Sequence, residues 1–475
     1  MTAATAPGRL PGIGHLLPLM TRPMPFLQSL ADLGPVVRMY LWRQPVYVLT
    51  SAQLVHRMLV RDSAKFEKGF VFDKARALLG NGLFTADAQT HLKHRRLVQP
   101  AFHRDRVAEY TELIIEQADD AVSSWSPGSL DARLRMGELS TDVVTTALFS
   151  TALTAEQKAI VVRALPAVLT GFIQRALYPH PVLEKVPLPT NRRFDAAVHD
   201  LRAVVDDIVA RCAPEDSNVV SLLLAARDEH TGEGMDAVQV RDEVVSLLLA
   251  GAETSATTLT WLLYELARHP ELQDEIRQEV ASVTGGGSLQ VDDVARLTRL
   301  GHALTETLRL HTPNWILMRR VIEPVEFDGT RLEPGAEILF SLSALHRDHA
   351  VFADPAKFDP DRWREGTVPR TSFMPFITGN RKCIGESFAW NEMVVIAASV
   401  VARWQLVLEP GCRVRENATS ATVQAGGLKI SVAPVAPVSV PRNISSVAPK
   451  CPMRTSDVDI QLQPTLVPGE GQGSR

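Results

Sequence analysis

Apolar residues recur at helical spacing along most of this chain. The pattern is helical almost throughout residues 107–227, with amphipathic segments at 139–153 and 194–211. Residues 244–266 and 387–402 form two further apolar runs that are long enough for helices. The chain is therefore predicted to be mainly α-helical.

Strand-like segments lie before and after this helical region. Residues 36–42 and 46–49 alternate and are rich in β-forming residues, which predicts a two-stranded ribbon with a turn near residues 44–45. Residues 314–322 form another strand-like run, and residues 425–428 have the composition of a hairpin tip. The predicted fold class is thus α+β, mainly α with small β-sheets.

Local signals add three elements near the N-terminus. Residues 25–33 are predicted to form a short helix, and Ser51 is a plausible N-cap for a helix that ends near residue 60. Residues 70–84 are apolar, but Gly80 and Gly82 interrupt them, which predicts a loop.

No segment is predicted to span a membrane. The apolar run 244–266 contains Glu253 and several hydroxyl side chains, so a buried core helix explains it better than a membrane helix. Residues 1–24 form a Pro-rich lead without an apolar run long enough for the core of a signal peptide. We therefore expect a soluble protein.

Composition narrows the class of protein. The chain has 475 residues, of which 45% are hydrophobic and 22% charged, and its formal net charge of -4 argues against nucleic acid as the main partner. Four cysteines in so long a chain do not make a disulfide framework, which favours the cytoplasm. We expect one domain over residues 1–433, followed by a flexible tail rich in Pro, Ser and Gly over 434–475.

The strongest chemical signal is the loop that leads into the helix 387–402. Cys383 precedes the helix N-terminus, where the helix dipole and free N–H groups favour a thiolate, a soft metal ligand. Gly379 would allow a tight turn, and Gly385 would let a flat macrocycle approach the backbone. Phe376 would shield the sulfur, and Arg381 offers a forked cation for a carboxylate such as a haem propionate. The alternative is a buried structural cysteine.

This spacing of Phe, Gly, Arg, Cys and Gly resembles the haem-ligand signature of the cytochrome P-450 family, the haem-thiolate monooxygenases. The resemblance covers about residues 10–433, with further motifs in the family's order. It implies the P-450 haem-thiolate fold and haem b with an axial Cys383 thiolate. It also implies that one oxygen atom of O2 is inserted into an unactivated C–H bond.

A second motif lies inside the apolar run 244–266. Ala250, Gly251, Glu253 and Thr254 combine small, acidic and hydroxyl side chains, which could make a notch in the helix. The motif resembles the family's oxygen-binding groove, and the resemblance implies that Glu253 and Thr254 bring in protons for O–O cleavage. The alternative is a helix that turns both side chains to solvent.

Three more positions resemble the family's haem contacts. His91 and Arg95 lie four residues apart and share one helix face, and the resemblance assigns both to a haem propionate. The alternative for this pair is a solvated basic face. Arg319 in the strand 314–322 is assigned the same role, although the adjacent Arg320 leaves this choice open.

A third motif is structural. Glu306 and Arg309 can pair on one helix face, and Arg362 lies in a segment that resembles the one completing the family's Glu/Arg/Arg cluster. Glu265 and Arg268 have the same spacing, but we interpret them as a surface pair.

The substrate is expected to be a lipophilic small molecule. By resemblance, an apolar pocket would be lined by Phe72, Phe84, Phe172, Leu247, Trp315, Ile316 and Ala425. These residues and the N-terminal motifs look similar to those of bacterial family members that oxidise terpenes and other lipophilic metabolites.

Electrons are expected from separate proteins, because no flavin or second dinucleotide-binding region is found. The resemblance implies a ferredoxin and a ferredoxin reductase, with electrons ultimately from NAD(P)H. Lys93, Arg96 and Lys382 could meet such an acidic partner, or could be plain solvated charges. We expect a monomer. Two alternatives are a haem-thiolate enzyme that uses peroxide and a non-catalytic haem carrier or sensor.

Overall fold

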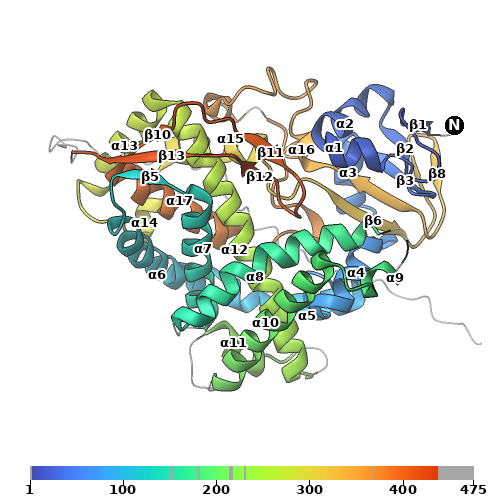
Figure 1. Cartoon of the computed structure of the whole chain (residues 1–475), viewed down its shortest axis with the longest axis horizontal. Helices are drawn as coiled ribbons and strands as arrows, with labels where there is room; N and C mark the ends of the chain where they lie inside the picture. Colours follow the sequence, from blue (N-terminus) through green and yellow to red (C-terminus); the bar gives the residue numbers. More distant parts are fainter. Residues whose placement is uncertain are drawn as a thin grey trace, which may run out of the picture.

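Helix α12 (Ala237–Arg268) runs through the middle of the molecule in the computed structural model (Figure 1). The structure describes residues 3–436 except 150–152, 179, 181, 213–217, 229–231 and 367. The Asp236 side chain accepts from the Gln239 N–H, and the Gln239 side chain accepts from the Asp236 N–H. These two hydrogen bonds form a capping box at the start of α12. Pro270 follows its end and begins the next helix.

Most of the chain is helical. The α-helices are α1 (Leu16–Thr21), α2 (Pro23–Ser29), α3 (Ala52–Leu59), α4 (Phe70–Leu79), α5 (Ala88–Val98), α6 (Arg104–Ser123), α7 (Ala132–Phe149), α8 (Ala155–Ala176), α9 (Val182–Lys185), α10 (Pro189–Arg211), α11 (Val219–Ala225), α12, α13 (Pro270–Thr284), α14 (Val291–Val294), α15 (Thr298–Leu310), α16 (Leu342–Leu345) and α17 (Glu386–Arg403). Short 3-10 helices are η1 (Ala31–Leu33), η2 (Ser63–Lys65), η3 (Gln99–Phe102), η4 (Pro360–Trp363) and η5 (Gly379–Arg381).

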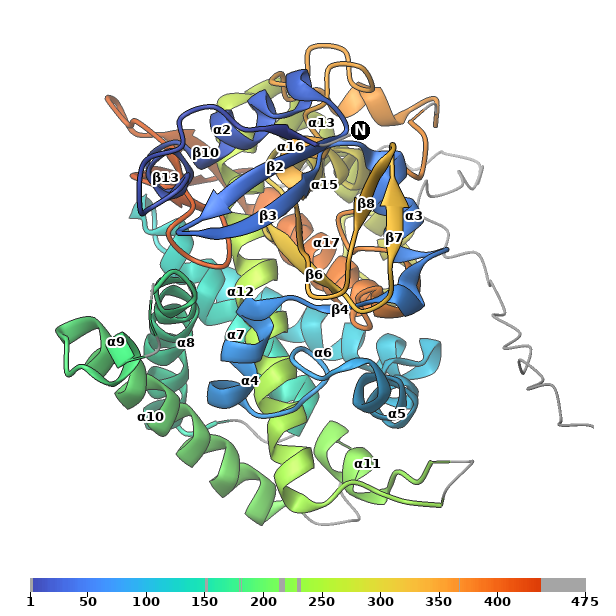
Figure 2. The ribbon, with the colours of Figure 1, turned by 90° about the vertical axis from the view of Figure 1, so that its right-hand side faces the viewer.

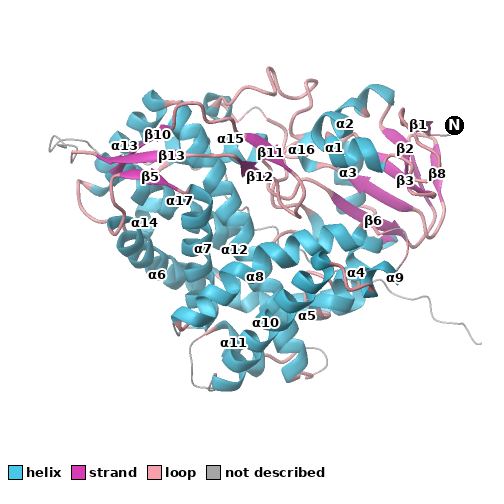
Figure 3. Cartoon of the chain, in the orientation of Figure 1, coloured by secondary structure: helices cyan, strands magenta, loops and turns pink. Residues whose placement is uncertain are grey.

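One sheet lies at each end of the helical body, and the hairpin β11-β12 lies between them (Figure 3). The strands are β1 (Ala4–Thr5), β2 (Val36–Leu41), β3 (Gln44–Leu49), β4 (Phe66–Lys68), β5 (Gly128–Leu130), β6 (Leu317–Val321), β7 (Val325–Phe327), β8 (Thr330–Leu332), β9 (Glu337–Phe340), β10 (Trp404–Leu408), β11 (Arg415–Asn417), β12 (Gln424–Gly426) and β13 (Ile430–Pro434). One sheet has the order β1-β2-β3-β9-β6-β4, and another has β10-β13-β5. The pairs β11-β12 and β7-β8 are hairpins. The predicted class, mainly α with small β-sheets, is confirmed.

Helix α12 is a core helix, as predicted. It packs against α7, α10 and α17, and Figure 2 shows it crossing the molecule between the helical layers. Val244, Leu248 and Leu262 are among its fully buried residues. Among the described residues, α8 alone is long and apolar enough to cross a membrane by length and composition, and half of its apolar window is buried in the protein.

Two local predictions are wrong. Residues 70–79 form the helix α4 rather than a loop, because Gly80 ends the helix at φ +84 and does not interrupt it. The turn of the N-terminal ribbon lies at Trp42 and Arg43, since Pro45 already pairs with Tyr40 in the sheet. The Ser51 cap is confirmed: its side chain accepts from the Leu54 N–H.

The chain after residue 433 is described only at its start. Strand β13 ends at Pro434, and the Val435 N–H donates to the Arg403 carbonyl, so the sheet reaches the first residues of the predicted tail. The remaining residues of the predicted tail, 437–475, lie outside the described residues.

Candidate active site

The shape of the cysteine loop is fixed by two contacts. The Cys383 N–H donates to the Phe376 carbonyl at 2.9 Å, which closes the loop in front of α17. Gly379 has φ +77, and a Cβ there would overlap the backbone carbonyl oxygen of Leu59. Glycine is therefore required at 379 for both conformation and space. Gly385 is less constrained, because a Cβ there would make an ordinary 3.6 Å contact with Phe102.

Cys383 keeps solvent-accessible surface, and protein atoms surround its thiol closely enough to reduce its hydration. Burial raises the pKa of this thiol to about 11, while the Gly385 N–H lowers it. The Gly385 N–H acts in the direction predicted for a helix N-terminus, but burial has the larger effect on the thiol in the protein alone. A coordinated metal ion would reverse the balance, because it binds the deprotonated sulfur.

Buried cations gather near the cysteine. Lys68 of β4, Arg95 of α5, Arg319 of β6 and Arg381 of η5 all act electrostatically on His91 of α5, and Arg319 and Arg381 also act on Lys68. Burial and mutual repulsion lower the pKa of Arg319 to about 9, and burial lowers that of Arg381 to about 10. The same causes lower the pKa of His91 to about 2, so its ring is neutral. The alternative of a solvated basic face is wrong for His91, which is buried.

Backbone carbonyl oxygens accept hydrogen bonds from only some of the N–H groups of these cations. Arg381 donates to the Ala86 carbonyl at 3.1 Å, Arg95 donates to the Lys382 carbonyl at 2.7 Å, and Lys68 contacts the Phe84 carbonyl. The second terminal nitrogen of Arg381, Nη2, is buried without a partner in the described part of the chain. An unpaired buried charge is costly, so this cluster is suited to an anionic group.

The two adjacent arginines of β6 point to opposite sides of the sheet. Arg320 donates to Asp73 at 2.7 Å and to Glu337 at 2.8 Å, and it lies 3.3 Å from Glu67. Within residues 3–436 as described, Arg319 pairs with no carboxylate and lies opposite Lys68 in the strand register. Of the two, Arg319 is therefore the one available to an anion.

These residues fit a haem with a thiolate ligand. The described residues contain no group of three His, Cys, Asp or Glu side chains that could hold a metal ion, so Cys383 would act as a lone protein ligand. Haem carries two propionates, and Arg95, Arg319, Arg381 and Lys68 are the cations that could meet them.

The hydroxyl of Thr254 bonds back to its own helix, α12. Thr254 Oγ1 donates to the Ala250 carbonyl at 2.6 Å, one turn earlier in the helix. Ala250 is exposed, in contrast to most of α12. Gly251 lies against α7: a Cβ there would lie 3.1 Å from the Val144 side chain, so glycine permits close packing of α7 against α12, and its place in an oxygen-binding groove stays a prediction.

Glu253 faces the hairpin β11-β12 rather than open solvent. Its Oε1 accepts from Thr422 Oγ1 at 3.1 Å and from Gln424 Nε2 at 2.8 Å. Glu253 also lines a cavity of about 250 Å³ between α7, α8 and the hairpin, together with Arg133. Burial raises the pKa of Glu253, and the hydrogen bonds and the Arg133 charge partly offset this. The carboxyl can therefore exchange protons more readily than an exposed glutamate.

The predicted structural cluster is assembled. Arg309 makes two hydrogen bonds to Glu306, at 2.9 and 2.8 Å, and both side chains are fully buried. Arg362 lies 3.4 Å from Glu306, and Trp363 donates its ring N–H to the same carboxylate at 2.9 Å. The Asp359 N–H also donates to Glu306, so the buried charge is well satisfied.

The proposed pocket residues differ in their surroundings. Phe72 and Phe84 form an edge-to-face pair at 5.5 Å beside Lys68. The rest divide between half-buried and buried positions: Leu247 and Ile316 are half-buried, whereas Phe172, Trp315 and Ala425 are buried, and Ala425 lines the cavity at Glu253. Their contact with substrate stays a prediction.

Two interpretations of charged residues change. Lys93, Arg96 and Lys382 pair with Glu233, Asp228 and Glu386 respectively, so these three predicted partner contacts already have acidic neighbours. Glu265 is buried and accepts from His311 at 2.8 Å, so it is not part of a surface pair.

Four functional candidates were not found in the sequence. Lys68, Thr422 and Gln424 belong to no contiguous chemical motif, whereas Trp363 ends the segment that carries Arg362; each acquires its role from a residue far away in the chain. Only Trp363, which follows Arg362 directly, carried a local signal.

Comparison with known proteins agrees with the motifs. The family model for Cytochrome P450 matches residues 5–431. Cyclooctatin synthase from Streptomyces melanosporofaciens is 38% identical over 433 residues, which are 90% of this chain and 94% of that protein. Cyclooctat-9-en-7-ol 5-monooxygenase from the same organism is 37% identical, over 86% of this chain and 91% of the relative. Pentalenene oxygenase from Streptomyces avermitilis is 34% identical, over 90% and 96%. The chain therefore belongs to the cytochrome P450 family and is a cytochrome P450 monooxygenase.

Proposed function

We propose that this monooxygenase hydroxylates a terpenoid or similar lipophilic metabolite. Support comes from relatives whose names give cyclooctat-9-en-7-ol and pentalenene as the molecules they act on, with matches over nearly the whole length of each protein. The overall reaction is R–H + O2 + 2 e⁻ + 2 H⁺ → R–OH + H2O. Phe72, Phe84, Leu247 and Ile316 supply apolar surface for such a substrate.

The family implies haem with a cysteine thiolate ligand and O2 as the co-substrate. When bound, haem supplies the oxygen chemistry. In our proposal Cys383 binds the iron, and Phe376 and Gly379 set the position of the sulfur. Arg319 and Arg381 bind the propionates, which relieves their unpaired burial.

In the same proposal, Arg95 and Lys68 also bind the haem propionates, and the neutral ring of His91 lies beside them. In the described structure, the side chains of Arg95 and Lys68 each hydrogen-bond to a backbone carbonyl oxygen. A carboxylate is the stronger acceptor, so haem binding would stabilise this part of the protein.

Proton supply is assigned to α12. Glu253 takes protons from the cavity of about 250 Å³ and passes them toward Thr254, whose hydroxyl is fixed by the Ala250 carbonyl. The buried carboxyl and its raised pKa support this role. Thr254 holds a proton at Oγ1 and orients it.

Electrons are proposed to come from a ferredoxin and its reductase, and ultimately from NAD(P)H. The family match takes up residues 5–431, and that region carries the oxygenase motifs. Because the relatives are bacterial proteins matched over more than nine-tenths of their length, we infer a cytoplasmic, soluble enzyme that acts as a monomer.

The test is turnover with defined electron donors. Purified protein loaded with haem is screened against cyclic terpenes for a substrate-induced spin shift, and binders are incubated with ferredoxin, ferredoxin reductase and NADPH. A product heavier by one oxygen atom, dependent on all three donors, supports the proposal. Turnover with hydrogen peroxide but not with ferredoxin would make the protein a peroxide-using enzyme, and binding without any product would make it a carrier.

A further inference from the structure

The carboxylate of Glu253 is held by residues from a distant part of the chain. Thr422 and Gln424, at the inner end of the β11-β12 hairpin, both donate to its Oε1. We propose that Gln424, with help from Thr422, is a positioning residue that fixes Oε1 of Glu253 and leaves Oε2 to exchange protons with the cavity and Thr254. This inference rests on the proton role proposed for Glu253.

The geometry favours a fixed orientation of the carboxylate. Both hydrogen bonds reach Oε1, so neither occupies Oε2. The Gln424 side chain is only 8% exposed, and its amide at 2.8 Å is the shorter of the two donors. A buried amide that donates to an ionised acceptor makes a strong hydrogen bond, because water does not compete with it.

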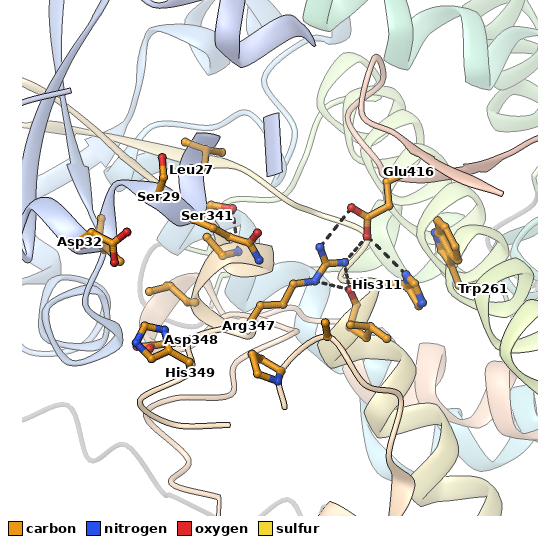
Figure 4. A pocket seen from close by; sticks show the side chains of 18 of the residues that line it. Leu27, Ser29, Asp32, Trp261, His311, Ser341, Arg347, Asp348, His349 and Glu416 are labelled. Carbon is orange, nitrogen blue, oxygen red and sulfur yellow. Dashed lines mark hydrogen bonds and ion pairs between the residues drawn. The ribbon is translucent and has the colours of Figure 1, made fainter. Parts of the chain in front are cut away.

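The hairpin itself is anchored on both sides of Gln424. Trp261 of α12 donates its ring N–H to the Val423 carbonyl at 2.7 Å, and the Val423 N–H donates to the Pro313 carbonyl at 3.1 Å. On the partner strand β11, Glu416 lies opposite Ala425, contacts Arg347 and lies 3.7 Å from His311, at one side of a second cavity (Figure 4). The donor to Glu253 is thus held in place by the fold before any substrate binds.

Few charges act on Glu253 from the elements around it. The α7 side of the cavity brings Asp131 and Arg133, whereas the α8 residues that line it are Val162, Leu165 and Pro166. The hairpin contributes the neutral Thr422, Gln424 and Ala425. Gln424 therefore supports the ionised form of Glu253 by hydrogen bonding, alongside the charge of Arg133.

The position of Gln424 also connects proton delivery with the substrate pocket. Ala425, the next residue, is one of the predicted pocket residues and lines the cavity at Glu253. Ala425 lies in strand β12 and not at a hairpin tip as predicted, so a substrate that contacts Ala425 touches the strand that holds the carboxylate. Coupling of electron use to product formation should depend on this contact.

The experiment replaces Gln424 by methionine, which keeps the length of the side chain and removes the donor. The protonation of Glu253 is followed in the holoenzyme by pH-difference infrared spectroscopy, with its carboxyl band assigned by loss in Glu253→Gln. We expect the midpoint of this band to move to higher pH in Gln424→Met, because a hydrogen bond to the ionised form is lost.

Turnover gives an independent readout. In Gln424→Met the share of electrons released as hydrogen peroxide should rise by about threefold or more, and the solvent deuterium isotope effect on kcat should increase. The control is Thr419→Val, a change in the same hairpin at an exposed residue whose hydroxyl bonds only Asn417 in the described structure. Its infrared midpoint and peroxide share should match those of the wild type.

The outcomes separate this inference from the proposed function. If Glu253→Gln leaves coupling unchanged, the proton role of Glu253 fails and the inference fails with it. If Glu253→Gln uncouples the enzyme but Gln424→Met changes neither the infrared midpoint nor the peroxide share, only the positioning role is overturned. Should Gln424→Met not retain haem, Thr422→Val, which removes the longer hydrogen bond, is judged by the same two readouts.

Discussion

The turn at Gly379 sets the position of the cysteine loop, so its replacement by alanine should disturb haem binding. Gly379 has φ +77, and a Cβ would overlap the Leu59 carbonyl oxygen. The left-handed conformation costs an alanine about 1–2 kcal/mol. Relief of the overlap requires a displacement of about 1 Å in the loop or in the end of α3, because packed atoms cannot interpenetrate. Cys383 follows only four residues later, so the sulfur moves with the turn.

The chain offers a matched control for this change. Gly411 has φ +76, but a Cβ there meets nothing within 4 Å. Gly411→Ala should therefore lose about 1–2 kcal/mol of unfolding free energy through conformation alone and keep its haem. Gly379→Ala should lose at least this amount, because the overlap adds to the conformational cost, and it should also lose a large share of its haem.

The assay measures haem per protein and the Soret band of the reduced carbon monoxide complex, with thermal unfolding as the stability readout. We expect Gly379→Ala to show less haem and a smaller red-shifted band than Gly411→Ala, and to unfold at a lower temperature, because the overlap and the lost haem both reduce its stability. A Gly379→Ala protein with wild-type haem content and band position would refute the reasoning that this contact fixes the loop.

Three further predictions follow from the contacts of single side chains. Arg319→Ala should accelerate haem loss to apomyoglobin, whereas Arg320→Ala, which breaks pairs with carboxylates, should lower thermal stability and leave the rate of haem loss unchanged; equal rates in the two variants would contradict the assignment. Trp363→Phe should lower the free energy of unfolding in urea by about 1.5–3 kcal/mol, because Glu306 loses a buried donor, and an unchanged midpoint would refute this. Burial would raise the pKa of Glu416, but the neighbouring His311 and the Arg347 guanidinium lower it to about 2, so the stability that Glu416 contributes is complete above its ordinary pKa and is lost as the pH falls toward 2. Glu416→Gln should accordingly be less stable than wild type near neutral pH, and the difference should shrink between about pH 4.5 and 2; a difference independent of pH would contradict this.

Contiguous motifs made the central chemistry predictable from sequence. The cysteine loop carries Phe376, Gly379, Arg381 and Cys383 within eight positions, and each contributes a property that the site requires. The pairing of Glu306 with Arg309 follows from helix geometry, because side chains three residues apart share one face.

Contacts between distant segments explain what the sequence left open. Gln424 meets Glu253 across 171 residues, and neither segment contains a sign of the other. The preference for Arg319 over Arg320 rests on contacts with distant residues, because Arg320 pairs with Glu67, Asp73 and Glu337 and Arg319 lies on the other side of β6. The prediction of a loop at residues 70–79 is also wrong, because Gly80 ends the helix α4 and does not interrupt it.

The central claim, that Cys383 is the thiolate ligand of a haem, is tested most directly by the carbon monoxide difference spectrum of the reduced protein beside that of Cys383→Ser. The account predicts a strongly red-shifted Soret band in the wild type and its loss in the variant, because only a thiolate ligand pushes this much electron density onto the iron. A wild type without a haem band, or a band that persists unchanged in Cys383→Ser, would contradict the claim.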